Sequence, residues 1–273
     1  MADMSGADRP DPELPPDPFP VGYVPPPLPP PPAAPRSRYA KRITVTAVLM
    51  VAFAVAAVLT GGISRAEATR KPTQAELSAA SAAGLAQRWQ RISAGSLFPA
   101  SVAYSTSVLT QEQATRVGIG PATGCAAAVD QTLAALAARY GCDGAVRASY
   151  VDALGGTVYT VGVLAFPTAH TAGEFYSRMP AASFPATGLN PLALAGTVTA
   201  RFTDAARQLS QAQLTGPYVV LIVAGYADGR AASATGEQRP SVFAPATQIA
   251  EAVYQPLDAP EVVNCQVRSE WSC

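Results

Sequence analysis

The sequence predicts an α+β domain, an antiparallel sheet with helices on one face, preceded by one transmembrane helix and a disordered proline-rich tail. Three observations give this prediction. Prolines dominate residues 1–35, an apolar run without ionisable side chains extends from Ile43 to Ile63, and strand and helix patterns alternate after residue 98. The expected parts are a cytoplasmic tail (1–35), a basic flank with the transmembrane helix (36–65), a juxtamembrane helix (66–97) and an extracytoplasmic α+β domain (98–273).

The tail has many prolines and few apolar side chains. Such a chain buries too little surface to offset its ordering entropy, so we expect disorder with polyproline II character. Residues 12–15 and 27–30 both fit the PxxP spacing, which presents a ridge to the aromatic groove of a proline-motif-binding protein. The alternative interpretation of the tail is a solvated spacer.

The apolar run suits a membrane-spanning helix, because about 20 residues at 1.5 Å per residue cover a bilayer core of roughly 30 Å. A secretory signal peptide would have a shorter apolar core and a position at the N-terminus. Residues 66–68 (Ala-Glu-Ala) imitate a cleavage site, so processing stays an alternative. The sequence therefore predicts a single-pass protein of the cell membrane.

Orientation follows from charge and cysteine content. Basic residues flank the apolar run on both sides, with a slight excess before it: Arg36, Arg38, Lys41 and Arg42 precede it, and Arg65, Arg70 and Lys71 follow it. All cysteines follow the run: Cys125, Cys142, Cys265 and Cys273. An even number of cysteines on one side favours an oxidising compartment, although metal binding also gives that pattern. We expect the N-terminus in the cytoplasm, the basic flank on the lipid bilayer, and the C-terminal domain outside.

Proximity in the sequence favours the disulfides Cys125–Cys142 and Cys265–Cys273. A single straight helix from Cys125 to Cys142 would separate the two cysteines by roughly 25 Å, whereas a disulfide needs Cα atoms about 4.4–6.8 Å apart. Asp130 is a good N-cap and would start the helix five residues later. The local pairing therefore requires a helix that begins near Asp130.

The layout of a PPPLPPPP segment, an apolar span and a cysteine-containing domain, with almost only arginine among the basic residues, resembles single-pass membrane proteins of high-GC Gram-positive bacteria that carry a proline-rich cytoplasmic tail. The resemblance covers the whole chain, is one of layout, and implies no active-site residue.

After the span, residues 73–76 match a capping box and predict a helix from about 74 to 93, in which Trp89 packs on the core. Residues 101–109 alternate as a half-buried strand, and a second capping-box match at 110–113 opens a short helix toward Val117. The remaining predicted elements are a helix from Asp130 to Gly141, a hairpin over 145–166 turning at 154–156, a helix over 168–179, strands at 196–202 and 217–230, and a last helix over 245–254.

Composition argues against several function classes. Nineteen basic residues balance nineteen acidic ones, which argues against nucleic-acid binding. His170 is the single histidine, and no Gly-x-Ser-x-Gly elbow accompanies it, so we interpret it as a surface residue. No zinc ligand spacing and no phosphate-binding loop is present, so no metal site, catalytic residue or cofactor is predicted.

Acidic side chains leave one catalytic alternative. Carboxylates of the outer domain, as a pair about 5–10 Å apart, could do glycosidase-like work: Asp143, Asp152, Glu174, Asp204, Asp228 and Glu251. The most conspicuous polar cluster is Asp228-Gly229-Arg230, which is either a turn or a binding loop made by Asp228 and Arg230.

We therefore expect a membrane-anchored, non-enzymatic binding or sensing module of the bacterial cell envelope. Its outer domain would bind an envelope protein or cell-wall component, and its tail would recruit a cytoplasmic partner. The alternative is a cell-envelope hydrolase that uses the outer-domain carboxylates. A pocket with converging carboxylates would favour the hydrolase, and an apolar binding surface would favour the module.

Overall fold

The computed structural model describes residues 47–58, 70–105, 111–180, 187–264 and 271. The chain divides into two units, Met1–Gly62 and Ile63–Cys273, which are described separately. The predicted proline-rich tail, the basic residues 36–42, Cys265 and Cys273 lie outside the described residues. The predictions made for them therefore stay predictions.

The structure contradicts the prediction of a transmembrane helix. Within the described ranges, no helix is long and apolar enough to cross a membrane. The same finding overturns the predicted fold class in its membrane part and the predicted single-pass location with a cytoplasmic N-terminus and an extracytoplasmic domain.

The second unit is an α+β domain. Its helices and strands, in chain order, are α2 (Gln74–Ala86), α3 (Arg88–Arg91), α4 (Ala94–Leu97), β1 (Ser101–Ser105), β2 (Gln111–Ile119), α5 (Cys125–Ala128), α6 (Gln131–Arg139), β3 (Gly144–Val151), β4 (Thr157–Ala165), α7 (Ala169–Ser177), η1 (Asp204–Ala206), β5 (Arg207–Thr215), β6 (Tyr218–Tyr226), α8 (Ala232–Thr235), η2 (Pro240–Phe243) and α9 (Pro245–Asp258).

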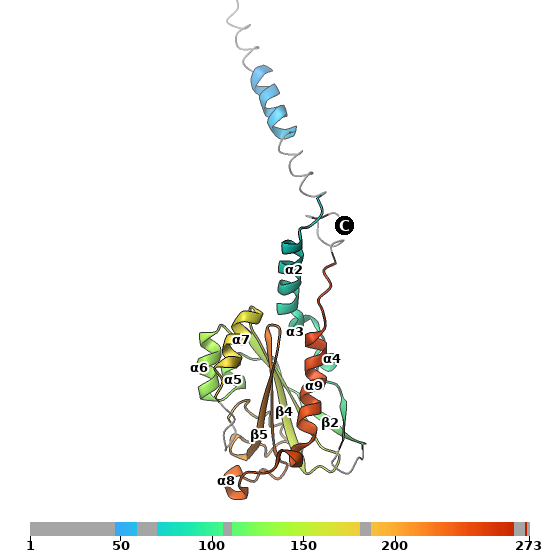
Figure 1. The fold of residues 1–273 in the computed structure, drawn as a ribbon, viewed down its shortest axis with the longest axis vertical. Coiled ribbons are helices and arrows are strands. Elements are labelled where there is room, and N and C mark those ends of the chain that lie inside the picture. Colours follow the sequence, from blue (N-terminus) through green and yellow to red (C-terminus); the bar gives the residue numbers. More distant parts are fainter. Residues whose placement is uncertain (1–46, 59–69, 106–110, 181–186, 265–270, 272–273) are drawn as a thin grey trace, which may run out of the picture. The chain divides into compact units, whose positions relative to one another are not determined.

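The six strands form one antiparallel sheet in the order β1-β2-β3-β4-β6-β5. Helix α9 packs on one face, while α6 and α7 pack on the other (Figure 1). The prediction of helices on one face is wrong, because every residue of β4 is buried and both of its faces therefore need cover. Tyr159 and Val161 of this strand point into the α9 side of the core, and Val158 and Leu164 point into the other side.

Several local predictions are confirmed. The hairpin of β3 and β4 turns through Gly155 with a φ of 70°, in the left-handed region that favours glycine. Helix α6 begins after Asp130, whose side chain accepts a hydrogen bond from the Leu133 N–H at 3.1 Å. The capping box of Thr73 and Glu76 is present at the start of α2. These elements are set by local chemistry that can be read from adjacent residues.

Two predicted elements are wrong. The helix expected to open at 110–113 is strand β2, in which Glu112 accepts a hydrogen bond from the Tyr104 hydroxyl instead of capping a helix. Pairing with both β1 and β3 satisfies this backbone better than one helical turn could. The strand expected at 196–202 is a series of turns. The strand that does form, β5, starts at Arg207, five residues after the end of the expected one.

The predicted helix from about 74 to 93 is broken into α2 and α3 at Gln87, and α3 is tied to the segment after α9. Glu261 accepts hydrogen bonds from Arg88 at 2.7 Å and from Arg91 at 2.8 Å. Trp89 packs on the α9 side of the core, as predicted, and its backbone N–H donates to the Tyr218 hydroxyl. The three charged side chains therefore join the two ends of the described domain.

We expect Glu261→Gln to lower the free energy of unfolding at neutral pH and to have no effect in acid. The guanidinium groups of Arg91 and Arg88 lower the pKa of Glu261 below its ordinary value of 4.5. A lowered folded-state pKa gives stability that is present at neutral pH and is lost as the pH falls through that pKa. Urea unfolding of wild type and variant should therefore differ at pH 7, and the difference should shrink as the pH falls below about 4.5 and vanish below the lowered pKa. Glu251→Gln, a change in an exposed side chain that bonds only to Gln255 among the described residues, is the matched control.

Candidate functional site

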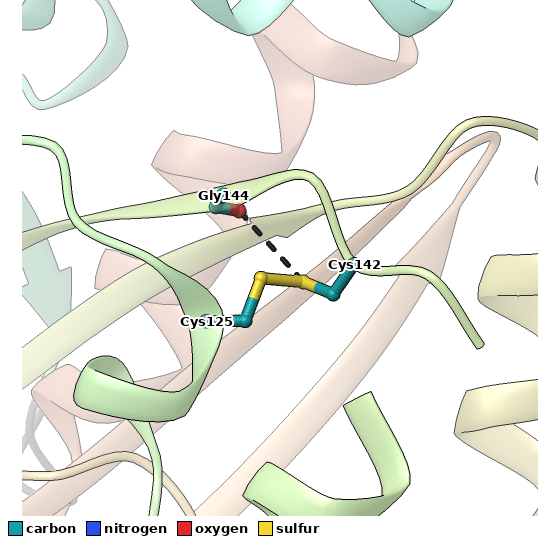
Figure 2. Close-up of a disulfide and its surroundings, with 3 residues drawn as sticks. All are labelled: Cys125, Cys142 and Gly144. Atoms are coloured by element: carbon teal, nitrogen blue, oxygen red, sulfur yellow. Dashed lines mark hydrogen bonds between the residues drawn. A yellow bond between two sulfur atoms is a disulfide. The ribbon is translucent and has the colours of Figure 1, made fainter. Parts of the chain in front are cut away.

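The disulfide Cys125–Cys142 is present, with Cα atoms 6.2 Å apart, which confirms the local pairing (Figure 2). Cys125 opens the short helix α5, and Cys142 lies between α6 and β3. The start of α6 after Asp130 is the condition that the pairing required. Nowhere in the described part of the chain do three or more His, Cys, Asp or Glu side chains gather into a group that could hold a metal ion.

The predicted binding loop, Asp228 and Arg230, follows β6 in a turn. Gly229 has a φ of 78°, and a Cβ at this position would meet the Arg201 carbonyl oxygen at 2.5 Å. The Arg230 Nε donates to Asp228 at 2.8 Å, and the guanidinium lies 4.6 Å from the centre of the Tyr226 ring. This hydrogen bond lowers the pKa of Asp228. The two charges satisfy each other, and the loop stays a prediction as a binding site.

The six predicted carboxylates are spread over the domain. Glu174 pairs with Arg178 on α7, and Glu251 bonds to Gln255 on α9. One pocket, of about 180 Å³, brings two carboxylates together: Asp152, which was predicted, and Glu112, which the wrong helix assignment hid. His170 is exposed on the first turn of α7, and no described side chain bonds to its ring.

Tyr104 closes the floor of this small pocket. Burial, and then its hydrogen bond to Glu112, raise the pKa of Tyr104 to about 12, so the hydroxyl stays protonated at neutral pH. Asp152 accepts the Thr157 N–H at 2.9 Å. Glu112 and Asp152 therefore each already accept a hydrogen bond from a group inside the domain.

Strand β5 is one of the two edge strands of the sheet, the other being β1. Its backbone orientation follows from the turn that joins it to β6. Thr215 and Tyr218 pair directly across a two-residue turn, which makes them a hydrogen-bonded pair. The alternation of an antiparallel ladder then points the backbone groups of Ser210, Ala212 and Leu214 away from β6. The Tyr176 hydroxyl approaches the Ala212 carbonyl oxygen to 3.5 Å, as this orientation requires.

No described strand pairs with the outer side of β5. We call Ser210, Ala212 and Leu214 the β5 edge. From Gln208 to Thr215 the strand carries no charged residue. Leu214 is 37 % exposed. Sheet edges are usually protected by lysine, proline or a bulge along their length. This strand has only a bulge at its start, between Arg207 and Leu209.

A pocket of about 420 Å³ lies beside the β5 edge. It is lined by Leu133, Tyr176, Met179, Pro180, Thr187, Ser210, Gln211 and Ala212, none of which is ionised at neutral pH. Helix α6 supplies one wall through Leu133, and the end of α7 supplies another through Tyr176. The pocket can therefore take an apolar or neutral side chain.

The disulfide-bonded region positions the wall of the pocket that contains Thr187. Residues 127–130 follow Cys125 and hold residues 188–190 by backbone hydrogen bonds. Asp130 N–H donates to the Gly188 carbonyl at 2.9 Å, and Asn190 N–H donates to the Ala128 carbonyl at 2.8 Å. Val129 and Leu189 form an isolated bridge between the two segments. The cross-link and the pocket are thus parts of one connected structure.

Comparison of the chain with family models, curated protein sequences and solved structures finds no match in any of the three.

The β5 edge and its pocket were not predicted from the sequence. A signal was present in the Gly216-Pro217 pair that precedes the buried run of β6, because such a pair joins hairpin strands. The alternation of apolar and polar residues before this pair is weak, because positions 208, 211 and 213 are all glutamine. That β5 lies at an edge depends on the order of all six strands, which no local pattern shows.

Proposed function

We propose that the domain is a non-enzymatic protein-binding module that takes one extended polypeptide segment as an added strand on the β5 edge. One observation carries the proposal: an edge free of charge along Gln208 to Thr215, with three residues turned outward, lies beside a pocket without an ionised lining. An extended peptide supplies the missing N–H and C=O groups and gains affinity from the main-chain hydrogen bonds.

The pocket gives the bound segment its side-chain preference. Side chains of an added strand alternate between the two sides of the sheet. A residue opposite Ser210 or Ala212 lies on the side of α7 and points toward the pocket. Because no charged group lines the pocket to pair with a charged ligand, an apolar side chain is favoured there. The volume of about 420 Å³ lies within the range of small-ligand sites.

A peptide display library, selected on the oxidised full-length protein, tests the proposal. Selected peptides should bind wild type and lose at least tenfold in affinity for Ala212→Pro. Proline removes an outward N–H and obstructs the incoming strand, while the hydrogen bonds to β6 remain, so an edge strand tolerates it. Titration calorimetry gives the affinities, and circular dichroism verifies that the variant is folded.

The matched control is Leu154→Lys. Leu154 is an 86 % exposed leucine in the turn between β3 and β4, away from the β5 edge. Peptides should bind this variant as they bind wild type. Peptides that bind Ala212→Pro as well as wild type, or that protect the small Glu112 pocket instead, would overturn the proposal.

A carboxylate-dependent hydrolase is the second candidate, because Glu112 and Asp152 line one pocket. Its volume of about 180 Å³ is below the roughly 300–1,000 Å³ of typical ligand sites. The two carboxylates also bond to Tyr104 and to Thr157. Release of soluble fragments from cell-wall glycan by wild type, and its loss in Glu112→Gln, would favour this candidate over the binding module.

A further inference from the structure

We propose that the segment that pairs with the β5 edge is β5 of a second copy of this chain, so that two domains form a symmetric dimer with a continuous sheet. The inference rests on the proposed function, because it names the partner for the same edge. It is carried by the sequence of β5 together with the position of one exposed leucine.

The exposed part of β5 has a glutamine on each side of a central alanine. It reads Leu-Ser-Gln-Ala-Gln-Leu-Thr over residues 209–215, with Ala212 at its centre. An antiparallel pair centred on Ala212 places this residue opposite its own copy, and each Gln211 opposite the second copy's Gln213. A two-fold interface requires this kind of self-complementary surface.

The backbone orientation matches the same register. Ser210, Ala212 and Leu214 have outward backbone groups, and the symmetric register pairs these three positions only with one another. Each such pair can exchange two hydrogen bonds, since it is a hydrogen-bonded pair of an antiparallel ladder. In this register Ala212 lies on the symmetry axis, and its small side chain leaves room for its own copy.

The exposed leucine and the pocket are complementary across this register. Leu214 of one copy stands opposite Ser210 of the other, and Ser210 lines the pocket of about 420 Å³. Both side chains lie on the α7 side of the sheet, so the 37 % exposed Leu214 would be directed toward the pocket between Tyr176 and Met179. The contact occurs twice in the dimer, which buries apolar surface on both copies.

Polar and charged groups are compatible with the pairing. Gln211 and Gln213, which face each other in this register, both carry neutral amides that can donate and accept hydrogen bonds. Arg207 is the single charged residue of β5. In the symmetric register the two copies of Arg207 lie at opposite ends of the ladder, so their charges do not repel each other at close range.

Sedimentation velocity of the oxidised protein over a concentration series tests the dimer. Wild type should shift from monomer to dimer as the concentration rises. Leu214→Lys should weaken the dimer roughly 100-fold, about tenfold for each of its two leucine sites. Ala212→Pro should abolish it by removing the central hydrogen bonds. Leu154→Lys, the same substitution at an exposed leucine elsewhere, should dimerise like wild type. Circular dichroism and thermal melts show whether each variant is folded.

Hydrogen exchange at the amides of Ser210, Ala212 and Leu214 separates this inference from the proposed function. Dimerisation with at least tenfold slower exchange at these amides supports self-pairing. A monomer in which these amides exchange rapidly overturns self-pairing and leaves the edge open to another polypeptide. A monomer in which they are protected overturns both, because the chain then covers its own edge. A dimer that survives both Leu214→Lys and Ala212→Pro overturns self-pairing through β5.

Discussion

The double variant Cys125→Ala/Cys142→Ala is expected to lose about 3 kcal/mol of the free energy of unfolding, because its unfolded chain is no longer closed into a loop. The two cysteines are 17 residues apart in the sequence, which sets the size of this entropic effect. Cys125 is also buried, so its truncation removes some packing in the same direction. Urea unfolding of the oxidised proteins at neutral pH measures the difference.

Reduction provides the internal control. Dithiothreitol should destabilise wild type by a similar amount, and any effect on the double variant would report the predicted Cys265–Cys273 bond, which that variant keeps. Equal stability of the oxidised wild type and the double variant would contradict the structural role of the bond. Because residues 127–130 hold the segment that leads to Thr187, we also expect the double variant to dimerise more weakly than wild type.

Elements set by neighbouring residues could be predicted from the sequence. Asp130 followed by a helical pattern predicted helix α6. Because the helix starts only after Asp130, the Cys125–Cys142 bond is geometrically possible. The Gly155-Gly156 turn between two β-rich runs gave the β3–β4 hairpin. In both cases one capping or turn residue decides the local backbone, and the tertiary structure agrees with it.

Elements that depend on distant partners could not be predicted. The capping-box match at 110–113 predicted a helix, but the chain from Gln111 forms strand β2, because two neighbouring strands satisfy its backbone hydrogen bonds. The apolar run from Ile43 to Ile63 satisfied a length rule, yet no described helix reaches the length of a membrane span. In β2 the local helix pattern was present, and pairing with strands distant in the sequence decided the outcome.

The candidate site shows the same limit. Asp228 and Arg230 are conspicuous in the sequence because they are charged and follow a buried strand, but they pair with each other. The β5 edge is inconspicuous in the sequence because its three uncharged residues alternate with the glutamines at 211 and 213. Its importance comes from its place at the end of the strand order and from the pocket that α6 and α7 build beside it.

Gly225→Ala is expected to lower the free energy of unfolding by about 3 kcal/mol, as overpacking against an immobile neighbour does. Gly225 lies on β6 and pairs with both Val158 and Arg207. A Cβ there would overlap the carbonyl oxygen of Ala206 and lie 2.7 Å from the Phe202 ring. The carbonyl belongs to the backbone between two fixed elements and cannot rotate away.

The close approach at Gly225 also explains why residues 196–202 are not a strand, since turns bring Phe202 and Ala206 over β6 before β5 begins. Gly173→Ala on α7 is the matched control. A Cβ there meets only Leu214, at 4.0 Å, and alanine favours a helix interior, so this variant should gain roughly 0.5–1 kcal/mol. Thermal and urea unfolding of the two variants should therefore change in opposite directions. A Gly225→Ala protein as stable as wild type would show that the 202–206 segment does not pack against β6, and the two-strand unit of β5 and β6 would then need a different support.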